Sequence, residues 1–158
     1  MQLVRAEQSD LPFIAALEQR PEFRSFVGSW PLAQHQAAFA DPDARYYIMA
    51  GRAGFVILRG LASEHRSIEV KRIIVAEPGQ GTGRQALEAV LALAFGTLGA
   101  HRVWLDTFED NTRARHLYGS LGFREDGVLR EAWCRDGQYK TLILMSMLDR
   151  EYAARPSS

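Results

Sequence analysis

The sequence predicts one mixed α/β domain, with a central sheet of six to seven strands and about four helices in the order βααβββαβαββ. Apolar runs of period two alternate along the chain with segments whose apolar residues recur every three or four positions. A strand–helix–strand unit at the centre requires a parallel pair of strands. The length of 158 residues fits a single domain. We expect this domain to span residues 1–152, followed by a loose tail at residues 153–158.

The first half of the chain is expected to supply four strands and two short helices. Ser9 is a candidate N-cap for the first helix, which tolerates Pro12 in its first turn. The second helix lies between Pro31 and Pro42. Two of the strands form a hairpin around the glycine-containing turn at residues 51–54. The expected strands are residues 2–6, 46–50, 55–61 and 67–76.

The second half of the chain is expected to supply two helices and three strands. Beyond Gly83, apolar residues recur at three- and four-residue spacing, which predicts an amphipathic helix that ends at Gly99. A further helix covers residues 112–121, where Gly122 is placed for a left-handed C-cap. The expected strands are residues 103–108, 128–134 and 139–148.

Composition excludes several classes of function. The chain has 19 Lys+Arg and 19 Asp+Glu, which argues against a polybasic nucleic-acid surface. Cys134 is the only cysteine, and the four histidines are scattered, so we expect no internal disulfide and no metal site. The apolar-rich stretch at residues 86–98 is too short to cross a bilayer, and no signal peptide is evident. We therefore expect a cytoplasmic protein that binds neither membrane nor nucleic acid.

The most informative segment is a loop with glycines at positions 79, 81 and 83, between a strand and a helix. Such a loop exposes backbone N–H groups at the positive end of a helix dipole, where they can bind a pyrophosphate without a lysine. The P-loop pattern fails because Arg84 stands where it requires the second glycine, and the third glycine comes one place too early for a dinucleotide fingerprint. A glycine-rich turn without a ligand is the alternative.

Two motifs in the correct order resemble the GNAT superfamily of acyl-CoA-dependent N-acetyltransferases. The run PGQGTG at residues 78–83 is similar to the family's phosphate-binding loop, although Pro78 replaces the usual Arg or Gln. The run NTRARHLY at residues 111–118, followed by LGF at residues 121–123, matches the family's second motif. Glu125, Gly127 and the turn at Asp136-Gly137 look most like the Rim-type branch, which modifies protein N-termini.

The resemblance implies acetyl-CoA as co-substrate and assigns roles to residues that match the motifs. Tyr118 corresponds to the general acid that protonates the departing thiolate, and Asn111 to a residue that hydrogen-bonds the pantetheine arm. Simple half-buried packing of Tyr118 and N-capping by Asn111 are the structural alternatives. The implied cofactor-binding residues are Ile73, Ile74, Val75, Gln80, Gly81, Thr82, Gly83, Arg84 and Asn111.

The attacking amine must also lose a proton, which calls for a base. Glu69 is the first candidate, acting directly or through water, and Asp106 on the next strand is the weaker one. Glu69 lies four residues before Ile73 and shares its side of the strand unless a bulge intervenes. A solvated strand carboxylate that balances Lys71 or Arg72 is the alternative interpretation of Glu69.

The sequence thus predicts transfer of an acetyl group from acetyl-CoA to a primary amine, by direct attack in a ternary complex. The acceptor is a small-molecule amine or a protein N-terminus, and a homodimer is common in the family. A non-catalytic acyl-CoA-binding module with the same fold is the alternative function. The acceptor site is expected between the first two helices and the last hairpin. Its candidate residues are Phe26, Trp30, Trp133, Tyr139, Arg130 and Arg135.

Overall fold

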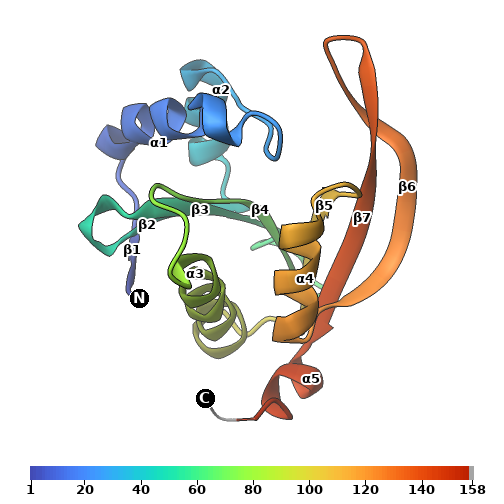
Figure 1. Cartoon of the computed structure of the whole chain (residues 1–158). Helices are drawn as coiled ribbons and strands as arrows, with labels where there is room; N and C mark the ends of the chain where they lie inside the picture. The colour runs from blue at the N-terminus through green and yellow to red at the C-terminus, as the bar shows by residue number, and fades with distance from the viewer. Residues whose placement is uncertain (157–158) are drawn as a thin grey trace.

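The computed structural model describes residues 1–156 and shows one seven-stranded sheet with helices on both faces (Figure 1). The strand order across the sheet is β1-β2-β3-β4-β5-β7-β6. The strands are β1 (Leu3–Arg5), β2 (Ala44–Met49), β3 (Gly54–Arg59), β4 (Ser67–Val75), β5 (Arg102–Phe108), β6 (Arg124–Arg135) and β7 (Gln138–Leu148). The α-helices are α1 (Leu11–Glu18), α2 (Leu32–Ala40), α3 (Thr82–Leu91), α4 (Thr112–Leu121) and α5 (Asp149–Ala153).

The predicted order of strands and helices is confirmed, with α5 added after the last strand. The start of α1 differs from the prediction. A short 3-10 turn at Gln8–Asp10 precedes this helix, Asp10 takes the N-cap position, and Ser9 makes no capping hydrogen bond. Of the expected tail, Ala153 belongs to α5, and residues 157 and 158 lie outside the described residues.

The sheet separates two hydrophobic cores. One core packs the apolar faces of α3 and α4 against the sheet and contains Val70, Leu105 and Leu121. The other packs α1 against the opposite face and contains Ile14, Phe55 and Ile74. In Figure 1, α1 and α2 accordingly lie above the central strands, and α3 and α4 lie below them.

The helix predicted after the glycine loop consists of two parts. Regular α-helix ends at Leu91 and continues as a π-helical segment over Ala92–Thr97, in which the N–H of Leu98 donates to the carbonyl of Leu93. Gly99, with φ of 68°, then ends the segment. The glycine stop is therefore confirmed, while the wider π-helical turn was not predicted.

The parallel pair β4–β5 is confirmed, but it is short. Paired residues are limited to Ser67↔Arg102, Ile68↔Val103 and Glu69↔Trp104. Beyond that point β4 continues to Val75 and β5 to Phe108 without pairing to each other. The two strands therefore separate near the middle of the sheet.

Two further findings concern the described residues only. No helix in residues 1–156 combines the length and the apolar character that a membrane crossing requires. Within the same residues, His, Cys, Asp and Glu side chains nowhere gather in groups of three that could hold a metal ion.

Candidate active site

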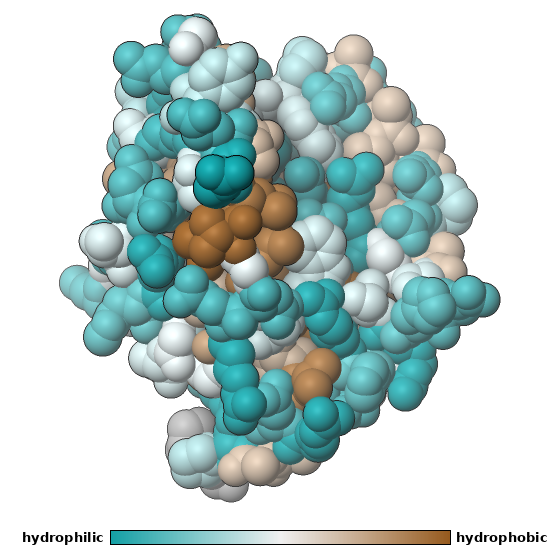
Figure 2. All heavy atoms as spheres, turned by 90° about the vertical axis from the view of Figure 1, so that its right-hand side faces the viewer, coloured by the Kyte–Doolittle hydropathy of each residue, from teal (hydrophilic) through white to brown (hydrophobic). Residues whose placement is uncertain are grey.

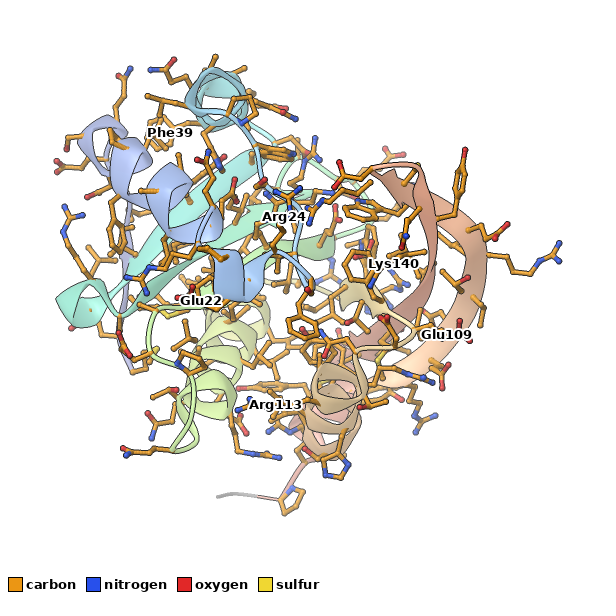
Figure 3. The ribbon with its side chains drawn as sticks, turned by 45° about the horizontal axis from the view of Figure 1, so that its top comes forward. Glu22, Arg24, Phe39, Glu109, Arg113 and Lys140 are labelled. Atoms are coloured by element: carbon orange, nitrogen blue, oxygen red, sulfur yellow. The ribbon has the colours of Figure 1, made fainter. Side chains whose placement is uncertain are left out.

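A cleft of about 670 Å³ opens where β4 and β5 separate. Its walls come from the unpaired halves of these strands, from the loop before α3, from α4 and from the α1–α2 loop (residues 19–31). Figure 3 shows the surroundings: Glu22 and Arg24 extend from the α1–α2 loop, Arg113 from α4, and Lys140 and Glu109 from the side of β7 and β5. The cleft thus runs between the loop before α3 and the α1–α2 loop.

The glycine loop forms one end of the cleft, where Gly79 and Gly83 line it. Gly79, Gln80 and Gly81 have φ values of 117°, 52° and 79°, so three successive residues adopt left-handed backbone. A Cβ added at Gly79 or Gly81 would meet no atom within 4 Å. These two glycines therefore serve backbone conformation and leave open space at the start of α3.

The first turn of α3 retains free backbone donors. The N–H of Thr82 donates to the carbonyl of Gly79 at 3.1 Å, and the Thr82 hydroxyl donates to the same oxygen at 2.7 Å. Among the described residues, no acceptor binds the N–H of Gly83 or of Arg84. These N–H groups, at the positive end of the helix dipole, are suited to phosphate oxygens.

The cationic side chains near the loop differ from the expectation. The guanidinium of Arg84 donates to the hydroxyl of Ser120 on α4. Arg113, in the first turn of α4, lines the cleft. Sequence reasoning included Arg84 among the cofactor-binding residues and missed Arg113, although Arg113 lies within the second motif.

Asn111 and Tyr118 lie on the α4 side of the cleft, and both line it. The side chain of Asn111 accepts a hydrogen bond from the N–H of Ala114 at 3.2 Å, so its N-cap role is confirmed. Tyr118 is half-buried and packs against Phe123, with ring centroids 5.9 Å apart. Burial, and then the negative charge of Asp106, raise the pKa of Tyr118 to about 12. Its phenol therefore remains protonated at neutral pH.

A β-bulge decides which way the candidate bases face. Ile57 pairs with Arg72 and Leu58 with Val70, which leaves Lys71 as the extra residue. Val70 and Ile73 consequently face the α3–α4 core together, although three positions separate them. Glu69 thus lies on the opposite face from Ile73, which corrects the expectation for an unbulged strand.

Asp106 shares that opposite face with Glu69, because each alternates with residues of the α3–α4 core. Asp106 lines the cleft, whereas Glu69 is half-buried beside it and outside the lining. Desolvation by the surrounding protein raises the pKa of both carboxyl groups, while Lys71 lowers it. A raised pKa brings a carboxylate closer to the basicity that proton abstraction requires.

The opposite end of the cleft has apolar walls. Phe26 and Trp133 line it as predicted, and Trp133 packs on Phe108 with ring centroids 4.8 Å apart. Trp30 instead packs under the guanidinium of Arg72, 4.7 Å from its carbon. Tyr139 is 64% exposed and lies outside the lining.

The two arginines considered for an acidic acceptor lie elsewhere. Arg135 donates to the backbone carbonyls of Arg24 and Val27, and so ties the β6–β7 hairpin to the α1–α2 loop. Arg130 is exposed and does not line the cleft. Arg135 is therefore a structural clamp rather than a free anion-binding group.

Sequence reasoning missed a buried polar network under the α1–α2 loop. Glu18 accepts hydrogen bonds from Nε2 of His35 at 2.7 Å, from the N–H of Trp30 at 2.5 Å and from Nη1 of Arg72 at 2.8 Å. Nδ1 of His35 lies 2.9 Å from the hydroxyl of Tyr46. The only signal in the sequence was a glutamate on the apolar face of a short helix, beside Leu17 and Ile14. The network fixes Arg72, which lines the cleft.

Comparison with known proteins identifies the family to which the chain belongs. Residues 1–124 match the acetyltransferase (GNAT) domain, and the chain belongs to that family. The spermidine N(1)-acetyltransferase of Vibrio cholerae is 34% identical over 103 residues, which is 65% of this chain and 60% of that protein. The Escherichia coli K12 enzyme of the same name is 31% identical over 104 residues, 65% of this chain and 56% of its own length. The matches therefore cover less than two thirds of either relative.

Solved structures agree over nearly the whole chain. The crystal structure of the Vibrio cholerae spermidine N-acetyltransferase in complex with CoA and spermine has a TM-score of 0.83 and 27% identity, covering 96% of this chain and 97% of that one. The expected GNAT family and fold are thereby confirmed. The Rim-type branch is not singled out, because the relatives that share 34% and 31% identity with this chain are spermidine acetyltransferases.

Proposed function

We propose that this protein transfers the acetyl group of acetyl-CoA to a primary amine. The separation of β4 and β5 carries the proposal, because it joins the free N–H groups of Gly83 and Arg84 to Tyr118 and to Asp106 through one cleft. The open space at Gly79 and Gly81 fits a pyrophosphate. Family membership and the CoA complex of a structural relative support the same co-substrate.

Each group has a distinct task in this reaction. Acetyl-CoA supplies the thioester whose carbonyl carbon the amine attacks. The backbone of Ile73, Ile74 and Val75, freed from pairing with β5, holds the peptide-like pantetheine arm, and Asn111 assists it. A backbone N–H of this strand polarises the thioester carbonyl. Pyrophosphate binding is assigned to Gln80, Gly81, Thr82, Gly83 and Arg84, with Arg113 as a further cation.

Proton transfers complete the exchange. As the nitrogen–carbon bond forms and the carbon–sulfur bond breaks, Asp106 takes a proton from the amine, and Tyr118 donates to the sulfur. The raised pKa keeps the phenol of Tyr118 protonated before the reaction, so it can give its proton to the sulfur as the carbon–sulfur bond breaks. A proton from solvent then restores the phenol. Glu69 acts through water or through Asp106, because it lies beside the cleft rather than in its lining.

The test is release of free thiol from acetyl-CoA on addition of primary amines. Spermidine and spermine belong in the panel because the relatives are named for polyamines. Peptide N-termini belong there too: the likeness to the Rim-type branch gains support from a Bacillus subtilis protein, 28% identical, whose name assigns it provisionally to ribosomal N-acetylation. CoA binding without thiol release on any amine would instead indicate the non-catalytic binding module. A homodimer and a cytoplasmic location stay predictions.

A further inference from the structure

Only some of the charged side chains that line the cleft form ion pairs. Three acidic and three basic side chains contribute: Glu22, Asp106, Asp110, Lys71, Arg72 and Arg113. Ion pairs engage half of them, namely Asp110 with Lys140 at 3.0 Å, Glu22 with Arg20 at 3.7 Å and Arg72 with Glu18 at 2.8 Å. Among the described residues, the other half makes no ion pair. Two of these three side chains, Lys71 and Arg113, are cations.

The two unpaired cations serve different ends of the cleft. Arg113 lies in the first turn of α4, on the side of the glycine loop. Lys71 lies at the other end, where its ammonium is 6.0 Å from the centre of the Trp30 ring. Arg113 is thus placed for the phosphates of CoA, which leaves Lys71 as the free cation of the acceptor end.

A β-bulge and an ion pair position two cationic donors at that end. Lys71 is the extra residue of the bulge in β4 and so interrupts the alternation of that strand. Arg72 follows directly and is held by Glu18 through Nη1 alone. Its other terminal nitrogen, Nη2, has no hydrogen-bond partner among residues 1–156 and lies where a Cβ on Gly28 would be 3.2 Å away. Lys71 and the open edge of Arg72 therefore form a two-residue donor site beside the α1–α2 loop.

Apart from Glu22, the α1–α2 loop contributes only apolar walls to this end. Phe23, Phe26 and Val27 of the α1–α2 loop face the cleft, opposite Phe108 and Trp133. Such walls bind a hydrocarbon or aromatic body. Two of the rings already carry cations of this chain, Lys140 over Phe108 and Arg135 over Trp133, and Glu22 of the same loop pairs with Arg20. Asp106 is the one carboxylate at this end without an ion pair among the described residues, and the proposed reaction uses it as base.

We propose that the acceptor is an apolar primary amine that also carries a carboxylate, and that Lys71 and Nη2 of Arg72 bind this carboxylate. The inference rests on the proposed function and narrows its substrate class to compounds of the amino-acid type. A polyamine carries only positive charge, so Lys71, which makes no ion pair among the described residues, would repel it. The acceptor would thus differ from the polyamine named for the relatives.

Matched acceptors test the proposal, because they differ only in the carboxylate. We would compare kcat/KM for L-phenylalanine and 2-phenylethylamine, for L-leucine and 3-methylbutylamine, and for spermidine, each corrected for its fraction of neutral amine. The amino acids should be preferred by about tenfold or more, as expected for a charge-assisted hydrogen bond. L-phenylalaninamide, which keeps the oxygen and loses the charge, should fall between the members of its pair.

A charge-removing variant identifies the residue responsible. Lys71→Gln should reduce the preference for the carboxylate about tenfold, as a change in the ratio of the two kcat/KM values. Arg130→Gln removes one exposed cation outside the cleft and is the matched control, which should leave the ratio as it is. An equal loss on both members of a pair would assign Lys71 to the acid–base groups and overturn the proposal.

A binding measurement gives a readout independent of turnover. The chain has only two lysines, Lys71 and Lys140, so ¹³C-dimethylation, which retains the charge, yields two side-chain signals. L-phenylalanine added to the CoA complex should shift the Lys71 signal and leave Lys140 in place. Thiol release with phenylethylamine or spermidine but not with the amino acids overturns the proposal and leaves acetyl transfer intact. Failure of every amine to release thiol contradicts the proposed function itself, and this inference with it.

Discussion

Glu18 accepts a hydrogen bond from Arg72 at 2.8 Å, and the two side chains are 0% and 7% exposed. Glu18 ends α1, whereas Arg72 lies in β4 at the edge of the cleft. The pair therefore joins α1 to β4, one of the two strands between which the cleft opens. The acceptor end is positioned by a residue that does not line it.

Removing the charge of Glu18 should destabilise the fold. Glu18→Gln leaves Arg72 without its buried partner, and breaking a buried pair from one side costs about 3–5 kcal/mol. Equilibrium unfolding in urea measures the loss. Glu64→Gln is the matched control, since Glu64 is 87% exposed and its replacement should change the free energy of unfolding by less than about 0.5 kcal/mol. Equal effects of the two variants would contradict a structural role for the network.

The ionised Glu18 of this pair should make the free energy of unfolding depend on pH in the acid range. Desolvation raises the pKa of Glu18, but the hydrogen bond from His35, the charge of Arg72 and the remaining donors together hold it below its ordinary value of 4.5. The ionised group therefore stabilises the fold above the unfolded pKa, and this contribution is lost as the pH falls from 4.5 through the lower folded value. Glu18→Gln should flatten that part of the stability–pH curve.

Tyr118→Phe should slow turnover and spare CoA binding. The phenol contributes a proton donor and little packing that phenylalanine cannot replace, so we expect kcat to fall by about 10²–10⁴-fold. Calorimetry with CoA supplies the control for binding. Unchanged turnover would remove the general-acid role and leave Tyr118 as a packing residue of the α3–α4 core.

Asp106→Asn should lower kcat/KM more than Glu69→Gln, because Asp106 lines the cleft and Glu69 does not. Burial raises the pKa of both groups above 3.8 and 4.5, respectively. A base must be deprotonated, so the acid limb of the kcat/KM profile should lie above these ordinary values and change shape in Asp106→Asn. Pre-steady-state thiol release as a function of pH measures it. A larger effect of Glu69→Gln would reverse the assignment.

Gly83→Ala should change the stability of α3 and the affinity for CoA in opposite directions. Gly83 has helical backbone, and an added Cβ would meet only the side chain of Leu117, at 3.7 Å. Alanine should therefore stabilise α3 by up to about 1 kcal/mol. The same methyl group should weaken CoA binding, because it occupies space beside the free N–H groups. A variant with higher Tm and undiminished CoA affinity would contradict close approach of the phosphates at Gly83.

In the glycine loop, the backbone conformation should contribute more to CoA affinity than the charge of a side chain. Gly81→Pro is incompatible with φ of 79° and should reduce CoA affinity more than Arg84→Ala, whose side chain is engaged with Ser120. Calorimetry compares the two, and circular dichroism checks that each variant is folded. A larger loss of CoA affinity in Arg84→Ala would indicate that the guanidinium, rather than the backbone, provides most of the attraction for the phosphates.

The parts of the site that sequence predicted are the local ones. A loop with three alternate glycines, the helix cap at Asn111 and the placement of Tyr118 each depend on residues a few positions apart. The order of strands and helices along the chain and the parallel pair follow from the same short-range patterns and from the right-handed crossover rule. All of these features could be read before any contact across the sheet was known.

The parts that escaped prediction depend on distant contacts or on one irregular residue. Glu18 and Arg72 are 54 positions apart, so no pattern in the sequence links them. The bulge at Lys71 reverses the face of every residue before it, and period-two reasoning cannot detect an extra residue. Arg135 was considered as a ligand for the acceptor, and only the fold shows that the carbonyls of Arg24 and Val27 engage it.

The clamp by Arg135 has a consequence for how such an enzyme diverges. It binds backbone carbonyls of the α1–α2 loop, as Glu18 binds the backbone N–H of Trp30, so these two anchors act on the backbone of the loop. Phe23 also packs against the α1 core, whereas Phe26 is 52% exposed, so mutation can exchange Phe26 while the loop keeps its course. Figure 2 shows the side of the molecule on which β6 lies, where hydrophilic residues surround smaller hydrophobic areas. Val128 and Leu129 of β6 are exposed apolar residues outside the lining of the cleft. In the proposed reaction, the residue that contacts the acceptor can thus change without altering the loop that would bind acetyl-CoA.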